Sequence, residues 1–214
     1  EGVHPEVRSA MEAALDVLRK LGATVKEVSL KLAKYSVPLQ LLTSDSDIAA
    51  MMLKRWLRTR WDDFDVGTRT RLAAGCLIPA TVYHRAMRAR ALVRREILET
   101  LAGCDALLCP ANLNPPERIE AAREQVDTLE DMDKKVLLRR ISTYPFSMAN
   151  IPAIALPMGY TKNELPVSLQ VAAKPFDEAT VFRVAHAYER ATPWHRRHPD
   201  LALTLQQSAA LAGA

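Results

Sequence analysis

The chain has 214 residues, of which 49% are hydrophobic and 25% are charged. This balance excludes a disordered chain and indicates a globular protein with one sizeable core. The formal charge of +4 is only mildly basic, and acidic residues are interleaved with Lys and Arg along almost the whole length, which argues against a nucleic-acid partner.

Cysteine usage and hydropathy indicate the compartment. Cys76, Cys104 and Cys109 are an odd number and include no C-x-x-C pair. They argue against a disulfide framework or a zinc site, and they fit a reducing compartment. No apolar run approaches the roughly 18 residues of a membrane span, and the first residues show no signal-peptide pattern. The sequence therefore predicts a cytoplasmic protein with no membrane partner, no bound metal and no other cofactor.

The N-terminal segment predicts a helix that begins near Pro5 and ends at Gly22. Proline suits the first turn of a helix, and glycine suits its C-terminal cap. Apolar residues recur with a helical period, at Val7, Met11, Ala14, Leu15, Leu18 and Leu21. Ala23 to Leu30 then alternates in the manner of a strand, and we expect a strand there.

Residues 38 to 64 have a helical pattern with a broad apolar face. Its members are Leu41, Leu42, Ile48, Met51, Met52, Leu53, Trp56, Leu57 and Trp61. We expect this face to pack in the core or form a lid, because such a stripe is far more often core than a cofactor site. The neighbouring Arg55, Arg58 and Arg60 are interpreted as a solvated helix face.

Between Arg69 and Leu101 the pattern predicts a short helix ending near Gly75 and, after Pro79, a long helix. The residues that recur at helical spacings on the long helix are Ala80, Tyr83, Met87, Ala91, Arg94, Ile97, Leu98 and Leu101. A run of arginines spread round this helix is interpreted as solvated surface: Arg85, Arg88, Arg90, Arg94 and Arg95.

Cys104 to Pro110 is an apolar run closed by proline, which predicts a buried strand. Because helices and strands alternate here, we expect part of the sheet to be parallel or mixed. Residues 111 to 138 are polar and charged, and they predict a surface excursion on one rim of the fold.

The stretch from Thr143 to Glu189 predicts a strand, a turn, a strand and a helix. The two strands are short apolar runs at 153–158 and 166–173, bounded by proline or turn residues. The helix has Val181, Val184, Ala185 and Tyr188 on its inward face. The last stretch, 201–214, is low in charge and is expected to be a loosely held tail.

Several segments, taken in order, resemble the amidase signature family. They are H-P-E-V (4–7), L-G-A-T-V (21–25), I-P-A-T-V-Y (78–83), D-A-L-L-C-P (105–110), P-F-S-M-A-N-I-P-A (145–153), E-L-P-V-S-L-Q (164–170) and F-D-E (176–178). The resemblance implies an α/β fold, layered α/β/α with a mixed β-sheet, of which residues 1–200 are the C-terminal part. Four strands are expected, near 24–30, 105–110, 153–158 and 166–173.

Amidase signature enzymes attack a carboxamide with a serine that is activated through a second serine and a lysine, and a glycine-rich segment stabilises the oxyanion. None of the nine serines of this chain lies beside a glycine: Ser9, Ser29, Ser36, Ser44, Ser46, Ser142, Ser147, Ser168 and Ser208. No catalytic residue is therefore assigned here. The resemblance implies that the catalytic residues lie on an N-terminal half of the amidase, and that this chain alone is inactive.

By the same resemblance, this half supplies the walls of the substrate pocket. Arg71 and Tyr83 are expected on helices that border the pocket, and Arg140 to Asn150 is expected to face the acyl side of a small-molecule amide substrate. The substrate-binding candidates are Arg71, Tyr83, Arg140, Thr143, Phe146 and Asn150. Packing or a surface ion pair is the competing interpretation for each of them.

The chain departs from the family pattern at several positions. Ser147 stands where the family usually has Asn, and Asn150, Glu164 and Ser168 stand where it has Gly. Ser168 is expected to tighten its strand, and Glu164 is expected to cost nothing at a turn.

Arg140 lies near the position where the glutamine-using component of the tRNA-dependent amidotransferase has an acidic residue for the substrate's α-amino group. Arg140 and the adjacent Arg139 would repel that ammonium, so we expect an anionic or neutral amide instead of glutamine.

The segment I-P-A-T-V-Y resembles the general amidase branch more closely than the other branches, so an amidase of that branch is the favoured interpretation and two alternatives remain. They are the glutaminase subunit of a tRNA-dependent amidotransferase and a catalytically inactive binding or scaffold module. Either way, a partner chain or a homodimer is expected to cover an open sheet edge.

Weaker constellations favour ordinary structural roles. A zinc site at His195 and His198 has no carboxylate or cysteine ligand at the right spacing. A thiol nucleophile, Cys104 or Cys109 with His84 or His186, is disfavoured because both cysteines flank a buried strand.

Overall fold

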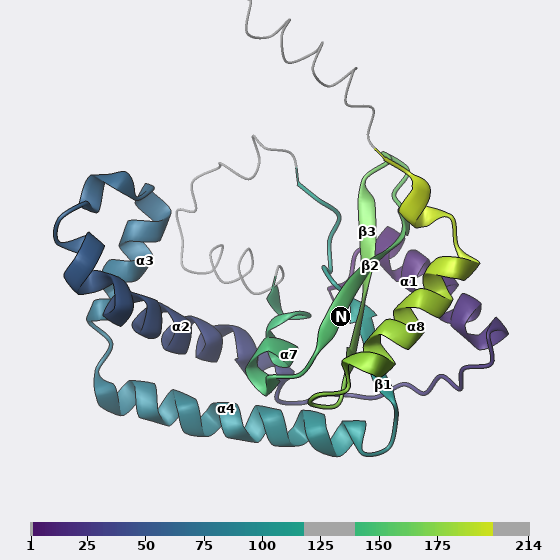
Figure 1. Ribbon diagram of the computed structural model, residues 1–214, viewed down its shortest axis with the longest axis horizontal. Helices are drawn as coiled ribbons and strands as arrows, with labels where there is room; N and C mark the ends of the chain where they lie inside the picture. Colours follow the sequence, from purple (N-terminus) through teal and green to yellow (C-terminus); the bar gives the residue numbers. More distant parts are fainter. Residues whose placement is uncertain (1, 118–139, 199–214) are drawn as a thin grey trace, which may run out of the picture.

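A computed structural model describes residues 2–117 and 140–198 of the chain (Figure 1). In chain order the elements are α1 (Pro5–Lys20), η1 (Ala33–Tyr35), α2 (Ser36–Met52), η2 (Leu53–Leu57), η3 (Trp61–Asp63), α3 (Val66–Cys76), α4 (Ala80–Leu101), β1 (Ala106–Pro110), α7 (Tyr144–Ala149), β2 (Ala153–Tyr160), β3 (Pro166–Ala173), α8 (Glu178–Ala191) and η4 (Trp194–Arg196). Most of the excursion predicted at 111–138 and all of the tail predicted at 201–214 lie outside the described residues.

The three described strands form one sheet in the order β1-β3-β2. Both pairs are antiparallel, with Leu107 opposite Ala172 and Leu156 opposite Leu169. β2 and β3 follow one another through a short turn, and such a turn can join only antiparallel strands. The predicted strands at 105–110, 153–158 and 166–173 are therefore confirmed, whereas the described part of the sheet is antiparallel and not mixed.

The strand predicted from Ala23 to Leu30 is wrong. This segment has no strand pairing, and nearly all of its side chains are exposed. An alternating pattern makes a strand only where a neighbouring strand receives its backbone hydrogen bonds. In the described fold the segment runs as an extended connection from α1 towards α2, and the Glu96 carboxylate accepts hydrogen bonds from the amides of Lys31 and Leu32 just beyond it.

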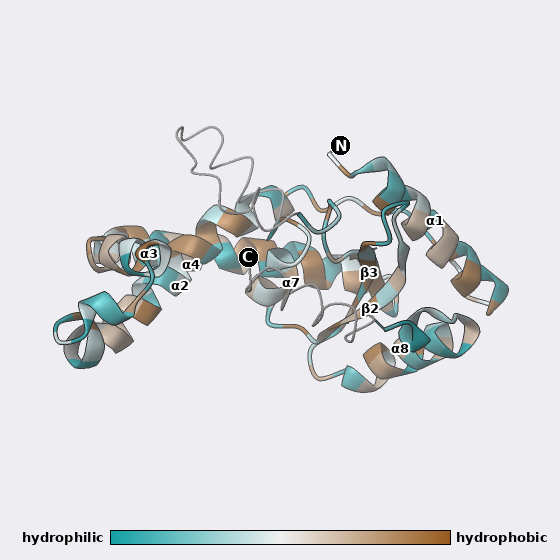
Figure 2. Ribbon diagram, turned by 90° about the horizontal axis from the view of Figure 1, so that it is seen from above, coloured by the Kyte–Doolittle hydropathy of each residue, from teal (hydrophilic) through white to brown (hydrophobic). Residues whose placement is uncertain are grey.

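The sheet has helices on both faces, so the predicted α/β/α layering is confirmed. Seen from above, α1 and α8 lie on one side of the strands and α7, with the α2–α4 helices, lies on the other (Figure 2). Alternation along β3 produces this division, because Val167, Leu169 and Val171 pack towards α1 and α8, whereas Ala172 packs towards α4 and α7.

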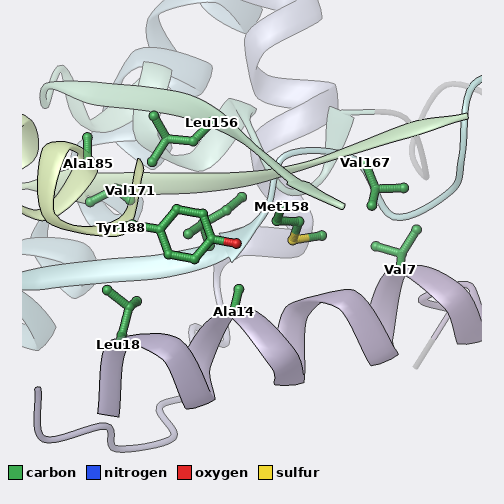
Figure 3. Packing of buried hydrophobic residues seen from close by; sticks show 10 residues of the cluster. Val7, Ala14, Leu18, Leu156, Met158, Val167, Val171, Ala185 and Tyr188 are labelled. Carbon is green, nitrogen blue, oxygen red and sulfur yellow. The ribbon is translucent and has the colours of Figure 1, made fainter. Parts of the chain in front are cut away.

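The core on the α1 and α8 side is a single apolar cluster (Figure 3). Val7, Ala14 and Leu18 come from α1, and Ala185 and Tyr188 come from α8. The inward face predicted for α8 is confirmed, whereas of the periodic apolar residues near α1, Val7, Ala14 and Leu18 are buried and Leu21 is 50% exposed. Gly22, with a φ of 94°, follows the end of α1 in a backbone conformation that suits glycine.

The helices on the other face bury only part of their apolar residues. α4 buries Ala86, Val93, Ile97 and Leu101, of which Ile97 and Leu101 belong to the set that recurs at helical spacings. In α2 the fully buried positions are small or medium-sized, and Met51 stays 78% exposed. Met51, Trp56 and Trp61 therefore do not pack in the core of the described chain, and a lid role for this apolar face stays a prediction.

Glu164 does not lie in an unstrained turn. Its φ is 61°, in the left-handed region that costs an ordinary side chain about 1–2 kcal/mol. The family's glycine at this position would adopt the same backbone freely. The expectation that Glu164 costs nothing is therefore wrong, and its exposed ion pair with Arg197, at 2.6 Å, offsets little of the strain.

Among the described helices, none is long and apolar enough to cross a membrane.

Candidate functional site

The segment expected to face the substrate, residues 140–150, is held at its N-terminal end by the sheet. The Ser142 hydroxyl donates to the carbonyl oxygen of Ala111 at 2.8 Å. The Ser142 carbonyl oxygen accepts from Gln170 Nε2 at 3.2 Å and from the Cys109 thiol at 3.6 Å. Because Gln170 and Ser142 are both buried, these bonds fix the entry into α7.

The C-terminal end of the same segment is held by α4. Arg90 Nε donates to the carbonyl oxygen of Met148 at 2.9 Å, and Arg90 Nη2 donates to Asn150 Oδ1 at 2.6 Å. The interpretation of Arg90 as solvated surface is therefore wrong. Asn150 has a φ of 51° and a ψ of 56°. Asn tolerates this left-handed conformation better than most residues other than glycine.

Between these two anchors, α7 presents one face to the core and one to solvent. Phe146 is 5% exposed and packs against Ile97, Leu101 and Ala172. Arg140 and Ser147 are exposed, and Thr143 is half-buried with its hydroxyl donating to the Arg140 carbonyl oxygen at 3.3 Å. Of the four candidates in this segment, Arg140 is thus open to a ligand, whereas Phe146 lies in the core.

The other two candidates, Arg71 on α3 and Tyr83 on α4, both form hydrogen bonds with side chains of α2. The Arg71 guanidinium forms a two-pronged ion pair with Asp45, in which Nε donates to Oδ2 at 3.2 Å and Nη2 to Oδ1. Tyr83 donates to Asp47 Oδ1 at 2.9 Å. The hydrogen bond that Arg71 donates to Asp45 raises the pKa of Arg71, and the one that Tyr83 donates to Asp47 raises the pKa of Tyr83.

Tyr144, which the sequence did not single out, lies beside one of the candidates. The Arg140 guanidinium lies over the Tyr144 ring, 5.8 Å from its centroid. The Tyr144 phenol also adds a minor part to the rise in the pKa of Arg71. One cation therefore faces this aromatic ring directly, and no sequence signal marked Tyr144 beyond its place next to Thr143.

This arrangement can bind but has no evident means to attack a carbonyl. Among the described side chains, no serine hydroxyl is hydrogen-bonded to a lysine. Ser142 and Ser147 bond to backbone oxygens, and the buried Ser36 hydroxyl has no partner. Nor does the described part of the chain hold three His, Cys, Asp or Glu side chains close enough to bind a metal ion.

The thiols differ sharply in environment, and this predicts their reactivity. Burial raises the pKa of Cys109 from 9.0 to about 12, and burial together with Asp105 raises the pKa of Cys104, whereas Cys76 is exposed. At pH 8 we expect iodoacetamide to label Cys76 quickly in the native chain, and Cys104 and Cys109 only after urea is added, as followed by mass spectrometry of peptides.

The raised pKa of Cys109 also predicts how the free energy of unfolding changes with pH. Between pH 9 and 12 the unfolded chain loses the Cys109 proton and the folded chain keeps it, so this thiol's contribution to the free energy of unfolding falls as pH rises through that window. Native-state labelling of Cys109 at the rate of Cys76 would contradict the buried thiol, and Cys109→Ser is the control that removes the alkaline loss.

Sequence comparison identifies relatives over most of the chain. The Amidase family profile matches residues 1–182. The A subunit of the glutamyl-tRNA(Gln) amidotransferase of Thermosynechococcus vestitus is 31% identical, over 94% of this chain and 45% of that protein. Its counterpart in Brevibacillus brevis is 33% identical, over 94% of this chain and 44% of that protein. The chain thus spans less than half the length of the curated relatives it matches.

Solved structures give the same coverage. A crystal structure of an amidase has a TM-score of 0.75 at 27% identity and covers 88% of this chain and 42% of that one. The A subunit of the Thermotoga maritima glutamyl-tRNA(Gln) amidotransferase has a TM-score of 0.69 at 28% identity, over 90% and 40%. The 6-aminohexanoate cyclic dimer hydrolase, at 20% identity, shares the fold with a TM-score of 0.80 over 94% and 44%.

Proposed function

Because the chain belongs to the amidase signature family, we propose that it is the C-terminal portion of an amidase that hydrolyses a carboxamide C–N bond. It contributes pocket walls and scaffold, and an N-terminal half contributes the serine, bridging serine and lysine. The observation that carries this proposal is the match to relatives over 94% of this chain but only 45% of their length, together with a serine set in which no described hydroxyl meets a lysine.

The N-terminal half is also the proposed partner for the open surfaces. In the described sheet the outer edges of β1 and β2 are unpaired, and unpaired edges are usually covered in native proteins. The same surfaces allow a homodimer as the alternative cover. The three free cysteines fit a reducing compartment, and on that basis we place the enzyme in the cytoplasm.

We propose an anionic or neutral amide as substrate, with the acyl side towards Arg140. Arg140 is exposed, and its guanidinium lies over the Tyr144 ring. Arg71 is already paired with Asp45, so Arg140 is the freer cation for a substrate carboxylate. A guanidinium repels the ammonium of glutamine, because like charges at short range are costly. Thr143 and Tyr83 complete the proposed polar lining.

The curated relatives favour a second candidate, the glutaminase subunit of a tRNA amidotransferase, because the matches above are to that subunit. An inactive binding module is the third. The three differ in what they turn over: simple amides, glutamine, or nothing.

The experiment is to purify the 214 residues alone and together with the polypeptide encoded upstream, and to measure kcat/KM on neutral amides, anionic amides and glutamine. We expect no turnover by the chain alone, turnover of neutral or anionic amides by the pair, and poor use of glutamine. Clear turnover by the isolated chain contradicts the proposal that the catalytic residues lie on an N-terminal half. Glutamine as the best substrate favours the glutaminase of an amidotransferase, and inactivity of the pair on all three favours the binding module.

Arg140→Asp is the matched variant for the substrate preference. It exchanges repulsion of an ammonium for attraction at an exposed position, and it leaves the buried anchors of α7 unchanged. We expect the ratio of kcat/KM for glutamine to that for an anionic amide to rise by about tenfold, the change that roughly 1.4 kcal/mol produces. An unchanged ratio of the two kcat/KM values would mean that Arg140 does not contact the acyl side of the substrate.

A further inference from the structure

Arg90 makes contacts that the sequence pattern did not predict, and the proposed function gives it no role. It lies on α4 among the buried positions Ala86, Val93 and Ile97, so that its side chain starts from the inward face of the helix and not from the solvated one. Its guanidinium reaches the last turn of α7 with two donors, one to a backbone oxygen and one to a side-chain oxygen. Arg94, one turn further on, adds a longer bond of 3.5 Å to the Asn150 carbonyl oxygen.

The end of α7 needs such a partner for physical reasons. The last carbonyl groups of a helix have no partner within the helix, and a cation there also meets the negative end of the helix dipole. α7 spans only Tyr144 to Ala149, so the helix itself supplies little cooperativity to hold its own end. The planar guanidinium fork fixes both distance and direction, which a single ammonium cannot do.

Asn150 supplies the side-chain half of the contact. Its backbone amide donates to the carbonyl oxygen of Ser147 at 3.2 Å, and its left-handed conformation turns the chain from α7 into β2. A glycine would adopt that backbone without strain but would offer Arg90 no amide oxygen. Arg90 and Asn150 therefore act as one unit, in which the side chain that replaces glycine is held by the arginine.

We propose that Arg90 is a positioning residue for catalysis, which sets the substrate-facing segment 140–150 by holding Met148 and Asn150. This inference rests on the proposed function, since it assumes that the segment faces a substrate. The other end of the segment is fixed independently at Ser142 by Gln170. Loss of Arg90 therefore frees one end only, and we expect α7 to shift while the sheet stays intact.

The first arm of the test is hydrogen exchange on the 214-residue chain, which needs no activity. Arg90→Ala is expected to speed exchange of the Asn150 and Ile151 amides by about 10- to 100-fold, as expected for hydrogen bonds to a charged group. Arg88 is an exposed arginine on the same helix, and Arg88→Ala is expected to change the exchange rate of these amides by less than about twofold. Equal exchange in the two variants contradicts the clamp.

The second arm is kinetics on the chain purified with its upstream polypeptide. Arg90→Ala is expected to lower kcat/KM by roughly 10- to 100-fold, mainly through kcat, because a displaced wall misaligns the bound amide. Arg90→Lys is expected to recover only part, since one ammonium cannot replace the fork. In an Asn150→Gly background the loss of kcat/KM caused by Arg90→Ala is expected to be a few-fold smaller, because the hydrogen bond from Arg90 to the Asn150 side chain is already absent.

These outcomes separate the two proposals. A wild-type pair without any amide turnover contradicts the proposed function, and the exchange arm then still decides whether Arg90 holds the turn. An active wild-type pair whose kcat/KM is the same in Arg90→Ala as in Arg88→Ala overturns the positioning role, even if exchange has changed. Equal losses for Arg90→Ala in the wild-type and Asn150→Gly backgrounds show that the two residues do not act as a unit.

Discussion

Leu169→Ala is expected to lower the free energy of unfolding by about 2–5 kcal/mol, the usual range for a fully buried leucine. Leu169 is 0% exposed, lies on the central strand β3 opposite Leu156, and packs into the cluster that α1 and α8 cover. Helices and strands surround the site, so it cannot collapse easily to fill the cavity. A shift of the urea midpoint at constant slope measures the effect.

The matched control for this substitution is Leu77→Ala. Leu77 is 81% exposed just after α3, so the same atoms are removed without leaving a cavity, and we expect a change within about 0.5 kcal/mol. Similar losses in the two variants would mean that the cluster between the sheet and its two outer helices is not the main source of stability.

Gly75→Ala is expected to cost about 1–3 kcal/mol or more through overpacking. α3 crosses α2 so closely that a Cβ at this position would overlap the carbonyl oxygen of Asp45 and lie 2.7 Å from its carbonyl carbon. These are backbone atoms, so no side chain can rotate to make room and the two helices must separate. The urea midpoint gives the cost, and hydrogen exchange of α2 and α3 shows where the separation occurs.

Gly103→Ala is the control, because its nearest heavy atom, the Thr100 carbonyl oxygen, lies at 3.8 Å, an ordinary contact. We expect a change within about 0.5 kcal/mol. The comparison also reports on the candidate site, since Asp45 carries the ion pair with Arg71. If Gly75→Ala leaves α2 and α3 protected from exchange, the close crossing of these helices does not exist in solution.

The local elements could be predicted where pattern and chain order agree. Pro166–Ala173 forms the predicted strand, and the inward face of α8 follows the apolar period of its sequence. The segment at Ala23–Leu30 shows the limit, because its alternation is real but its strand needed a neighbour that the described chain does not provide. Strand order and pairing direction likewise depend on contacts between segments far apart in the sequence.

The site was harder to predict because its geometry comes from partners on other elements. Arg71 and Tyr83 were expected at a pocket wall by resemblance, but the two aspartates of α2 that hold them have no motif. Arg90 was interpreted as one of a run of solvated arginines, since sequence spacing cannot tell which of five similar side chains finds a carbonyl oxygen. The resemblance implied a glycine at the positions of Asn150 and Glu164, and a glycine often marks left-handed backbone. Both residues do have a positive φ, but Glu164 was expected to cost nothing there.

The strand order also has a consequence for synthesis on the ribosome. Among the described strands β1 pairs only with β3, which is translated after α7 and β2, so at about 5–20 residues per second the nascent β1 waits for seconds without its partner. α4, however, is translated immediately before β1, and Val93, Ile97 and Leu101 of α4 belong to the same apolar cluster as Leu107. The long helix can therefore shelter the apolar strand from the chaperone-binding and aggregation risks of that interval until the hairpin arrives.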